Sequence, residues 1–155
     1  MGHLLVFQCG KEEFGLPIEE TREVRRMTNI ISVPHAPEFV EGLIRLRGRT
    51  VAMIDLNKRL GIKAKERTAQ SRFIVARARG VIVGLTVDNV EEVLEISEKD
   101  IEPAPSIVLP INDGYIRNVV EFEERLILIL NLDEILSKEE AKKIHELKNE
   151  NHSPD

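Results

Sequence analysis

The chain has 155 residues, which is enough for one domain or for two small ones that share a core. Hydrophobic residues make up 42% of it and charged residues 32%, as is usual for a globular protein that folds in water. The formal net charge of −5 argues against nucleic-acid binding, and the longest apolar run, residues 126–130, is too short to cross a bilayer.

Short β-strands dominate the elements that the sequence predicts. In chain order, they cover residues 4–9, 14–18, 29–33, 42–46, 50–54, 72–78, 81–87, 90–96, 115–122 and 126–130. Tight turns separate several of them, at Gly10-Lys11, at Gly80, and at the matching positions Arg47-Gly48-Arg49 and Glu123-Glu124. The last strand has no polar alternation, so we expect it to be buried on both faces.

Two helices are predicted near the ends of the two strand groups. Asp55 can cap a short helix over 56–60, because a carboxylate accepts hydrogen bonds from the first backbone N–H groups. A second helix covers about 133–148, and a capping box at 137–140 predicts a break in it. The polar tail, 149–155, is expected to fray. The second helix carries an apolar stripe of Ile135, Leu136, Ala141, Ile144 and Leu147.

The sequence also contains an internal repeat. Residues 4–34 align with 73–103 at an offset of 69, which superposes Gly15 on Gly84. A second stretch aligns at an offset of 76, and an insertion of about seven residues near 104–114 accounts for the change. Two similar halves, about 4–60 and 73–136, predict a mainly β fold of two small closed barrels that pack on a shared core.

No motif for catalysis, phosphate binding or metal binding is present. The sequence lacks GxxxxGK[ST], GxGxxG and GxSxG, and its four histidines have no convincing ligand spacing. Cys9 has no obvious base and lies in an apolar run, where a buried, inert thiol is expected. We therefore expect no catalytic residue, no metal and no cofactor, and predict a binding module. The alternative is a small β-barrel enzyme or ligand-binding protein with a pocket at the seam, the junction between the barrels.

One segment is more specific than the rest. Val33-Pro34 is followed by Pro-Glu-Phe-Val-Glu-Gly-Leu-Ile-Arg-Leu-Arg-Gly at 37–48 and by Val-Ala-Met-Ile-Asp-Leu at 51–56. This pattern resembles the signature of the CheW family, the coupling proteins of bacterial chemotaxis. The resemblance covers about residues 4–137. Arg45 departs from it, because asparagine is usual at that position.

The resemblance implies a fold and a function. The fold would be two SH3-like five-stranded β-barrel subdomains on a shared core with a C-terminal α-helix, forming one domain over residues 1–148. The function would be that of a non-enzymatic scaffold that couples the regulatory domain of the chemotaxis histidine kinase CheA to the cytoplasmic tips of methyl-accepting chemoreceptors. Neither nucleic acid nor direct membrane insertion is expected. The location would be the cytoplasm, at receptor arrays on the inner face of the membrane.

The resemblance also indicates residues that contact a partner or shape the seam. Arg47 has two interpretations, a direct partner contact or a structural ion pair with Glu23. Gly48 is expected in a turn with positive φ, and Gly42 where two backbones approach closely. The full set is Thr21, Glu23, Val24, Gly42, Arg45, Arg47, Gly48 and Val87.

Overall fold

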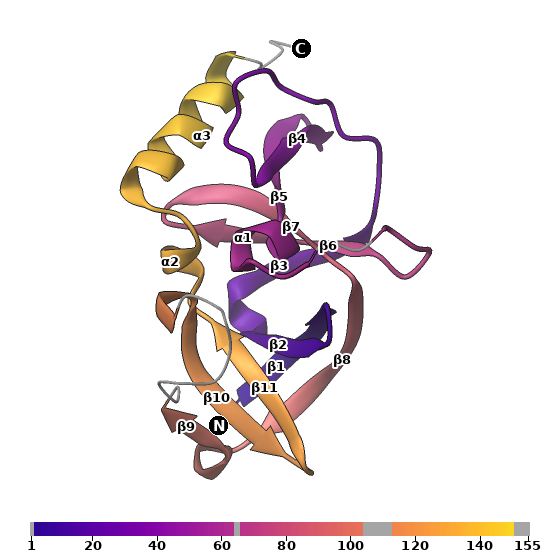
Figure 1. The fold of residues 1–155 in the computed structure, drawn as a ribbon, viewed down its shortest axis with the longest axis vertical. Helices are drawn as coiled ribbons and strands as arrows, with labels where there is room; N and C mark the ends of the chain where they lie inside the picture. The colour runs from indigo at the N-terminus through magenta and orange to yellow at the C-terminus, as the bar shows by residue number, and fades with distance from the viewer. Residues whose placement is uncertain (1, 64–65, 104–112, 151–155) are drawn as a thin grey trace.

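Two β-sheets form most of the molecule, one above the other in Figure 1. The structure is a computed structural model that describes residues 2–63, 66–103 and 113–150. Its strands are β1 (Gly2–Cys9), β2 (Glu12–Pro17), β3 (Thr21–Arg26), β4 (Val40–Leu46), β5 (Arg49–Asp55), β6 (Arg72–Ala78), β7 (Val81–Val87), β8 (Asn89–Ile96), β9 (Ile101–Pro103), β10 (Ile116–Phe122) and β11 (Arg125–Leu130). Within the described residues, the lower sheet has six strands in the order β8-β1-β2-β11-β10-β9, and the upper sheet has five in the order β3-β6-β7-β5-β4.

Each sheet takes strands from both halves of the repeat. The β1–β2 hairpin pairs with β8 and β11 of the second half, and the β6–β7 hairpin pairs with β3 and β5 of the first half. The two edges of each sheet are joined by the chain itself. β8 leads through a short turn into β9, and β3 leads to Ile31, which forms a β-bridge with Leu43 of β4. We therefore call the lower sheet barrel A and the upper sheet barrel B.

The pairing register follows the repeat. Gly15 in β2 and Gly84 in β7 each lie between an antiparallel neighbour and a parallel one, and the neighbours are related by the same offsets of 69 and 76. The two glycines therefore occupy equivalent places in the two barrels. Their partners are Val6 and Ile129 for Gly15, and Val75 and Met53 for Gly84.

Buried side chains form three clusters. Because successive residues of a strand point to opposite faces, Leu4 and Val6 of β1 fill barrel A, whereas Leu5 and Phe7 join a cluster between the barrels. β6 divides its residues in the same way between barrel B and that central cluster. The central cluster is the largest of the three, so the predicted shared core is confirmed.

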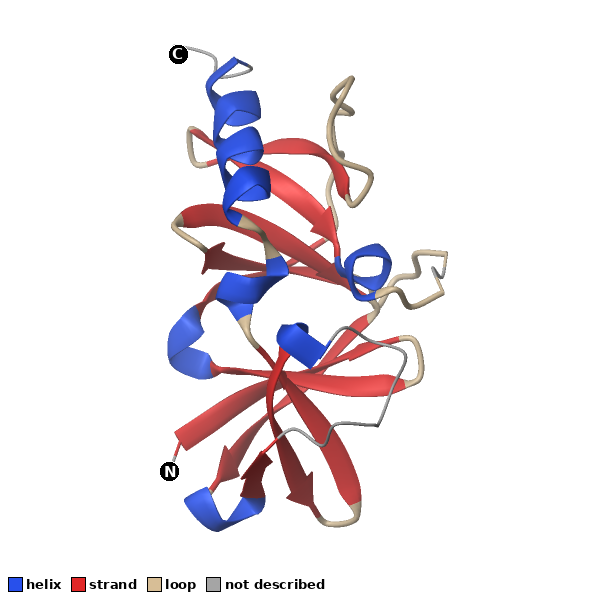
Figure 2. Ribbon diagram, turned by 60° about the vertical axis from the view of Figure 1, so that its left-hand side comes forward, coloured by secondary structure: helices blue, strands red, loops and turns tan. Residues whose placement is uncertain are grey.

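Three α-helices lie along one side of the barrels, α1 (Leu56–Leu60), α2 (Leu132–Ile135) and α3 (Lys138–Glu150) (Figure 2). Asp55 caps α1, because its carboxylate accepts a hydrogen bond from the backbone N–H of Lys58 at 3.2 Å. The predicted break between α2 and α3 is confirmed. Ser137 and Glu140 form the expected reciprocal capping bonds, of 2.8 and 3.0 Å. Three 3-10 turns complete the described elements, at Ile18–Glu20, Glu98–Asp100 and Asp113–Tyr115.

Several sequence-based predictions need correction. The strand predicted at 29–33 is wrong, because only Ile31 pairs with β4; Pro34 and Pro37, which have no N–H group, follow closely. Leu126 is 39% exposed rather than buried, since it lies near the tip of the β10–β11 hairpin.

Strand number and helix length also differ from prediction. The short strand β9 gives barrel A six strands among the described residues instead of five. α3 extends to Glu150, two residues beyond its predicted end. Most of the insertion predicted near 104–114 and most of the polar tail lie outside the described residues.

Candidate partner-binding site

Strand β3 carries three of the predicted site residues at the edge of barrel B. Thr21 begins the strand, where its hydroxyl donates a hydrogen bond to the carbonyl of Ile18 at 2.8 Å. Val24 is 38% exposed, so part of its apolar side chain is accessible to a partner. Glu23 lies between them in sequence and is only half-buried. β3 therefore presents both apolar and charged groups to solvent.

The β4–β5 hairpin contributes three more of these residues, Arg45 at the end of β4 and Arg47 and Gly48 in the turn. Arg47 and Gly48 both have positive φ, 51° and 77°, which is the conformation of a tight hairpin turn and explains the glycine. The side chain of Arg45 folds back over this turn and donates to the carbonyl of Gly48 and the hydroxyl of Thr50, both at 3.4 Å. The turn thus holds two arginines at the same end of barrel B.

An ion pair joins β3 to this turn. The Arg47 guanidinium donates two hydrogen bonds to the Glu23 carboxylate, at 2.6 and 3.0 Å, and Arg25 donates a third at 3.0 Å. Hydrogen bonds from Arg47 and then from Arg25 lower the pKa of Glu23 to about 2. Because β3 and β4 are the two edge strands of barrel B, this pair also spans the closure of the barrel.

Gly42 and Val87 lie in the interior rather than at this surface. A Cβ atom at Gly42 would overlap the carbonyl oxygen of Ile31, so this glycine permits the close approach that was predicted. Val87 is only 4% exposed and belongs to the central core. The structure therefore brings together Thr21, Glu23, Val24, Arg45, Arg47 and Gly48 around one end of barrel B, and separates Gly42 and Val87 from contact with solvent.

A polar pocket of about 350 Å³ lies at the seam. Its lining is Glu19, Glu20, Arg22, Arg77, Arg117, Asn131, Leu132 and Asp133. The part of the chain that the structure describes contains no group of three or more histidine, cysteine or acidic residues placed to hold a metal ion. Cys9 is buried, and burial raises the pKa of its thiol, which disfavours the reactive thiolate.

Sequence reasoning missed a half-buried arginine that connects several elements. Arg59 of α1 lies 4.2 Å from the ring centre of Phe39 and 5.3 Å from that of Tyr115. It also donates two hydrogen bonds, of 2.9 and 2.7 Å, to the Glu140 carboxylate of α3. These partners are up to 81 positions away in sequence, and no local pattern marks them.

The fold and the site define a class of protein: a small double-barrel binding module whose exposed edge mixes apolar and paired charged side chains. Comparison with known proteins is specific. Residues 3–140 match the family of CheW-like domains. A chemotaxis protein CheW from Rhizobium meliloti is 39% identical over 137 residues, which is 88% of this chain and 88% of that protein. A chemotaxis protein CheW from Thermotoga maritima is 32% identical over 138 residues, 87% of each.

A solved structure agrees with this assignment. The scaffolding protein TtCheW from Thermoanaerobacter tengcongensis superposes with a TM-score of 0.83 at 34% sequence identity, covering 90% of this chain and 94% of that one. The chain belongs to the CheW family. It is a non-enzymatic scaffold of chemotaxis that couples CheA to receptors, so the alternative of an enzyme is set aside. None of the described helices has the length and apolar character that crossing a membrane requires.

Proposed function

We propose that this chain binds the regulatory domain of CheA and the cytoplasmic tip of a chemoreceptor at two separate surfaces, and holds both at once. In this proposal it works in the cytoplasm, in receptor arrays at the inner face of the membrane. Signals would pass as a change in the relative geometry of the bound partners, without chemistry in the scaffold.

The receptor tip is assigned to the surface of β3 and the β4–β5 turn. The observation that supports this most is the distribution of exposed apolar side chains. Of the five large exposed ones among the described residues, three lie in residues 18–31: Ile18, Val24 and Ile31. An α-helical partner that buries an apolar stripe needs such groups, and Glu23 and Arg47 would form a charged rim beside them.

The kinase is assigned to barrel A. The other two exposed apolar side chains, Val93 and Leu126, lie there, on β8 and β11. Leu126 is near the tip of a hairpin, so it is accessible to a flat partner such as the end of another barrel. Because each barrel has its own exposed apolar residues, the two assignments predict separable variants.

The test is a titration of each partner in the presence of a saturating amount of the other. Val24→Glu should weaken receptor-tip binding at least about thirtyfold and leave kinase binding unchanged, because an unpaired charge is costly inside an apolar contact. Leu126→Glu should do the reverse. Equal loss of both partners in either variant, with the fold intact, would contradict separate surfaces. Direct competition between the two partners would contradict the bridge itself.

The test of Arg47 needs a measurement that distinguishes a direct contact with the partner from a structural ion pair with Glu23. In Arg47→Ala, we expect the pKa of Glu23 to rise from about 2 toward its usual range, because the largest stabilising partner of its charged form is lost. A depressed carboxyl pKa stabilises the fold at neutral pH, and this contribution is lost as the pH falls through the folded-state pKa. Carboxyl-detected NMR measures this pKa directly. The pair is exposed, so thermal unfolding at neutral pH should change little.

The outcome for Arg47 decides between its two interpretations. Weaker receptor binding in Arg47→Ala, with an unchanged unfolding temperature, would assign the guanidinium to the interface. Glu23→Gln is the matched variant, because it breaks the same pair and leaves Arg47 in place. If Glu23→Gln weakens binding as much as Arg47→Ala does, the pair acts by holding β3 against the turn.

A further inference from the structure

A β-bulge in β3 gives Arg22 an unusual position. Thr21 lies opposite Ala76 of β6 and Glu23 lies opposite Val75, so Arg22 is the extra residue of the bulge. A bulge bends the strand and redirects the side chain of the extra residue. Here the side chain of Arg22 lines the seam pocket, together with that of Arg77, the neighbour of Ala76 in β6.

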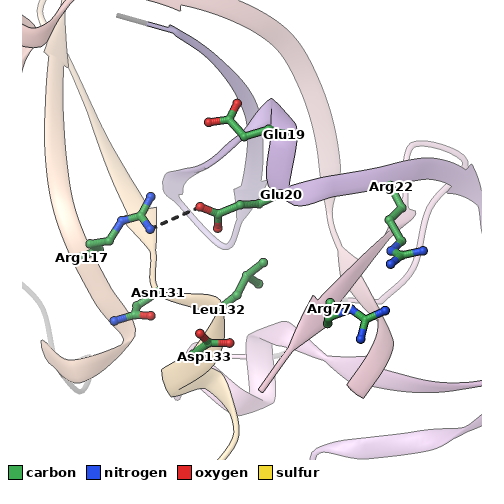
Figure 3. A pocket seen from close by; sticks show the side chains of 8 residues that line it. All are labelled: Glu19, Glu20, Arg22, Arg77, Arg117, Asn131, Leu132 and Asp133. Atoms are coloured by element: carbon green, nitrogen blue, oxygen red, sulfur yellow. Dashed lines mark hydrogen bonds and ion pairs between the residues drawn. The ribbon is translucent and has the colours of Figure 1, made fainter. Parts of the chain in front are cut away.

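The charges of the seam pocket are separated into two groups. Figure 3 shows Arg22 and Arg77 together at one side, with Asp133, Glu20 and Arg117 at the other. The carboxylates of the second group already have partners. Glu20 pairs with Arg117 at 3.3 Å, and Asp133 accepts a hydrogen bond from the backbone N–H of Arg79 at 2.8 Å.

The side chains of the two arginines, in contrast, have no partner in the part of the chain that the structure describes. Among residues 2–63, 66–103 and 113–150, the side chain of neither Arg22 nor Arg77 makes a hydrogen bond or an ion pair to another residue. Both side chains are exposed, so their guanidinium donors are open to solvent and to a ligand. Paired arginines of this kind bind carboxylate and phosphate oxygens, because the planar fork of N–H donors matches the geometry of those groups.

Further positive charge lies beside Arg77. Lys148 of α3 donates a hydrogen bond at 3.3 Å to the carbonyl of Ile82, the residue opposite Arg77 in the β6–β7 hairpin. Burial, and then the charges of Arg49 and Arg77, lower the pKa of Lys148. This part of barrel B is therefore locally cationic in a chain whose net charge is −5.

The bulge itself does not require a cation. Barrel A has the equivalent bulge in β8, between the pairs of Glu92 with Val6 and of Val90 with Phe7. The extra residue there is Glu91, which corresponds to Arg22 at the offset of 69. Since the same backbone feature carries opposite charges in the two barrels, the arginine is a property of this pocket and not of the fold.

We propose that Arg22 and Arg77 form an oxyanion-binding subsite in the seam pocket, which takes a carboxylate or phosphate group. The group could belong to a small anion or to an acidic segment of a protein. The facing carboxylates, Glu20 and Asp133, favour a ligand that carries its negative charge at one end only (Figure 3). This subsite adjoins the surface assigned above to the receptor, because Arg22 lies on β3 between Thr21 and Glu23.

The experiment is an NMR titration of the full chain with two probes, inorganic phosphate and a capped oligoglutamate peptide, against sodium chloride of equal ionic strength. We expect saturable shifts of the backbone amides at Arg22 and Arg77 with at least one probe. Arg22→Gln/Arg77→Gln should weaken this binding about tenfold or more, because each charge-assisted hydrogen bond contributes substantially. Arg26→Gln/Lys142→Gln is the matched control, since it removes two exposed positive charges elsewhere.

Each outcome decides the proposal. Saturation by phosphate alone identifies a small-anion site, and saturation by the peptide alone identifies an acidic protein segment. Shifts that do not saturate with either probe, or that both double variants weaken equally, would overturn the proposal, because they would show only general attraction to positive charge. The chemical shifts outside the pocket report whether each variant keeps its fold.

Discussion

Apart from β9, barrels A and B have the same strand order when the two halves of the repeat are exchanged, yet many of their charged residues differ. The apolar residues that fix the register, such as Val6 and Val75 beside the equivalent glycines, are matched. The charged residues at equivalent bulges, Arg22 and Glu91, are opposite. Packing therefore maintains the repeated architecture, whereas the surface charge differs between the two barrels.

The substitution expected to affect the two barrels most differently is at Gly42, where we compare the loss in the free energy of unfolding. Its equivalent in barrel A at the offset of 76 is Asn118, where a side chain is accommodated. A Cβ at Gly42 would meet the Ile31 carbonyl and lie 2.8 Å from Cγ2 of Ile30, and φ is +154°. Gly42→Ala should therefore lower the free energy of unfolding by about 2–4 kcal/mol, whereas Asn118→Ala should cost about 1 kcal/mol or less. Urea unfolding measures both, and equal losses would contradict the asymmetry.

A smaller loss of stability is expected for a substitution at Arg59. The equivalent position in the other half of the repeat is Ile135 of α2, which is buried. Arg59→Met keeps the apolar stem but removes both hydrogen bonds to Glu140. We expect a loss of about 2 kcal/mol in the free energy of unfolding, because charge-assisted bonds are lost at a site where Arg59 is 14% exposed. Ile135→Val is the control, with an expected loss of about 1 kcal/mol. Stability unchanged in Arg59→Met would show that packing alone holds α3.

Amide hydrogen exchange in α3 shows whether the effect of Arg59→Met is local to this helix. Glu140 both caps α3 and holds Arg59, and these contacts outweigh its burial, so its pKa is lowered. Arg59→Met should therefore speed amide exchange in the first turn of α3 more than in β10 or β11. Uniform acceleration would indicate global destabilisation.

Much of the fold was predictable from sequence, because alternating apolar residues and glycines at turns indicate where strands begin and end. β1, β2, β6 and β7 are clear for this reason. β3 was not predicted as a strand, since Thr-Arg-Glu-Val-Arg-Arg contains a single apolar residue and is held by pairing with β6. β9 is too short to be marked by periodicity.

The site was less predictable. The Glu23–Arg47 pair could be proposed from the family resemblance, and the structure contains it. Val87 could not be assigned to the core or the surface, because a β-rich sequence does not show which face of a strand is covered. The presence of Arg22 and Arg77 in one pocket depends on a bulge, which shifts the alternation by one residue and leaves no sequence pattern.

The smallest expected effect concerns the bulge of barrel A. Glu91 lies beside Glu13, Glu92 and Arg125; Arg125 bonds to Glu13 at 2.7 Å and to Glu92 at 2.9 Å. Burial, and then the charge of Glu13, raise the pKa of Glu91, whereas the bond from Arg125 lowers that of Glu13. A carboxyl whose pKa is raised by folding binds its proton more tightly in the folded state, so its ionisation destabilises the fold as the pH rises through that pKa.

Glu91→Gln removes this ionisation, so the variant should unfold at a slightly higher temperature than the wild type at neutral pH. The advantage should disappear as the pH falls below about 4, the usual carboxyl range, where Glu91 is protonated in both folded and unfolded chains. Thermal unfolding across a pH series tests this, with Arg22→Gln as the control at the equivalent bulge, where no such pH dependence is expected because arginine stays charged. If Glu91→Gln remains more stable than the wild type at low pH, the cause is packing rather than charge. The two bulges would then differ in shape as well as in the charge of their extra residue.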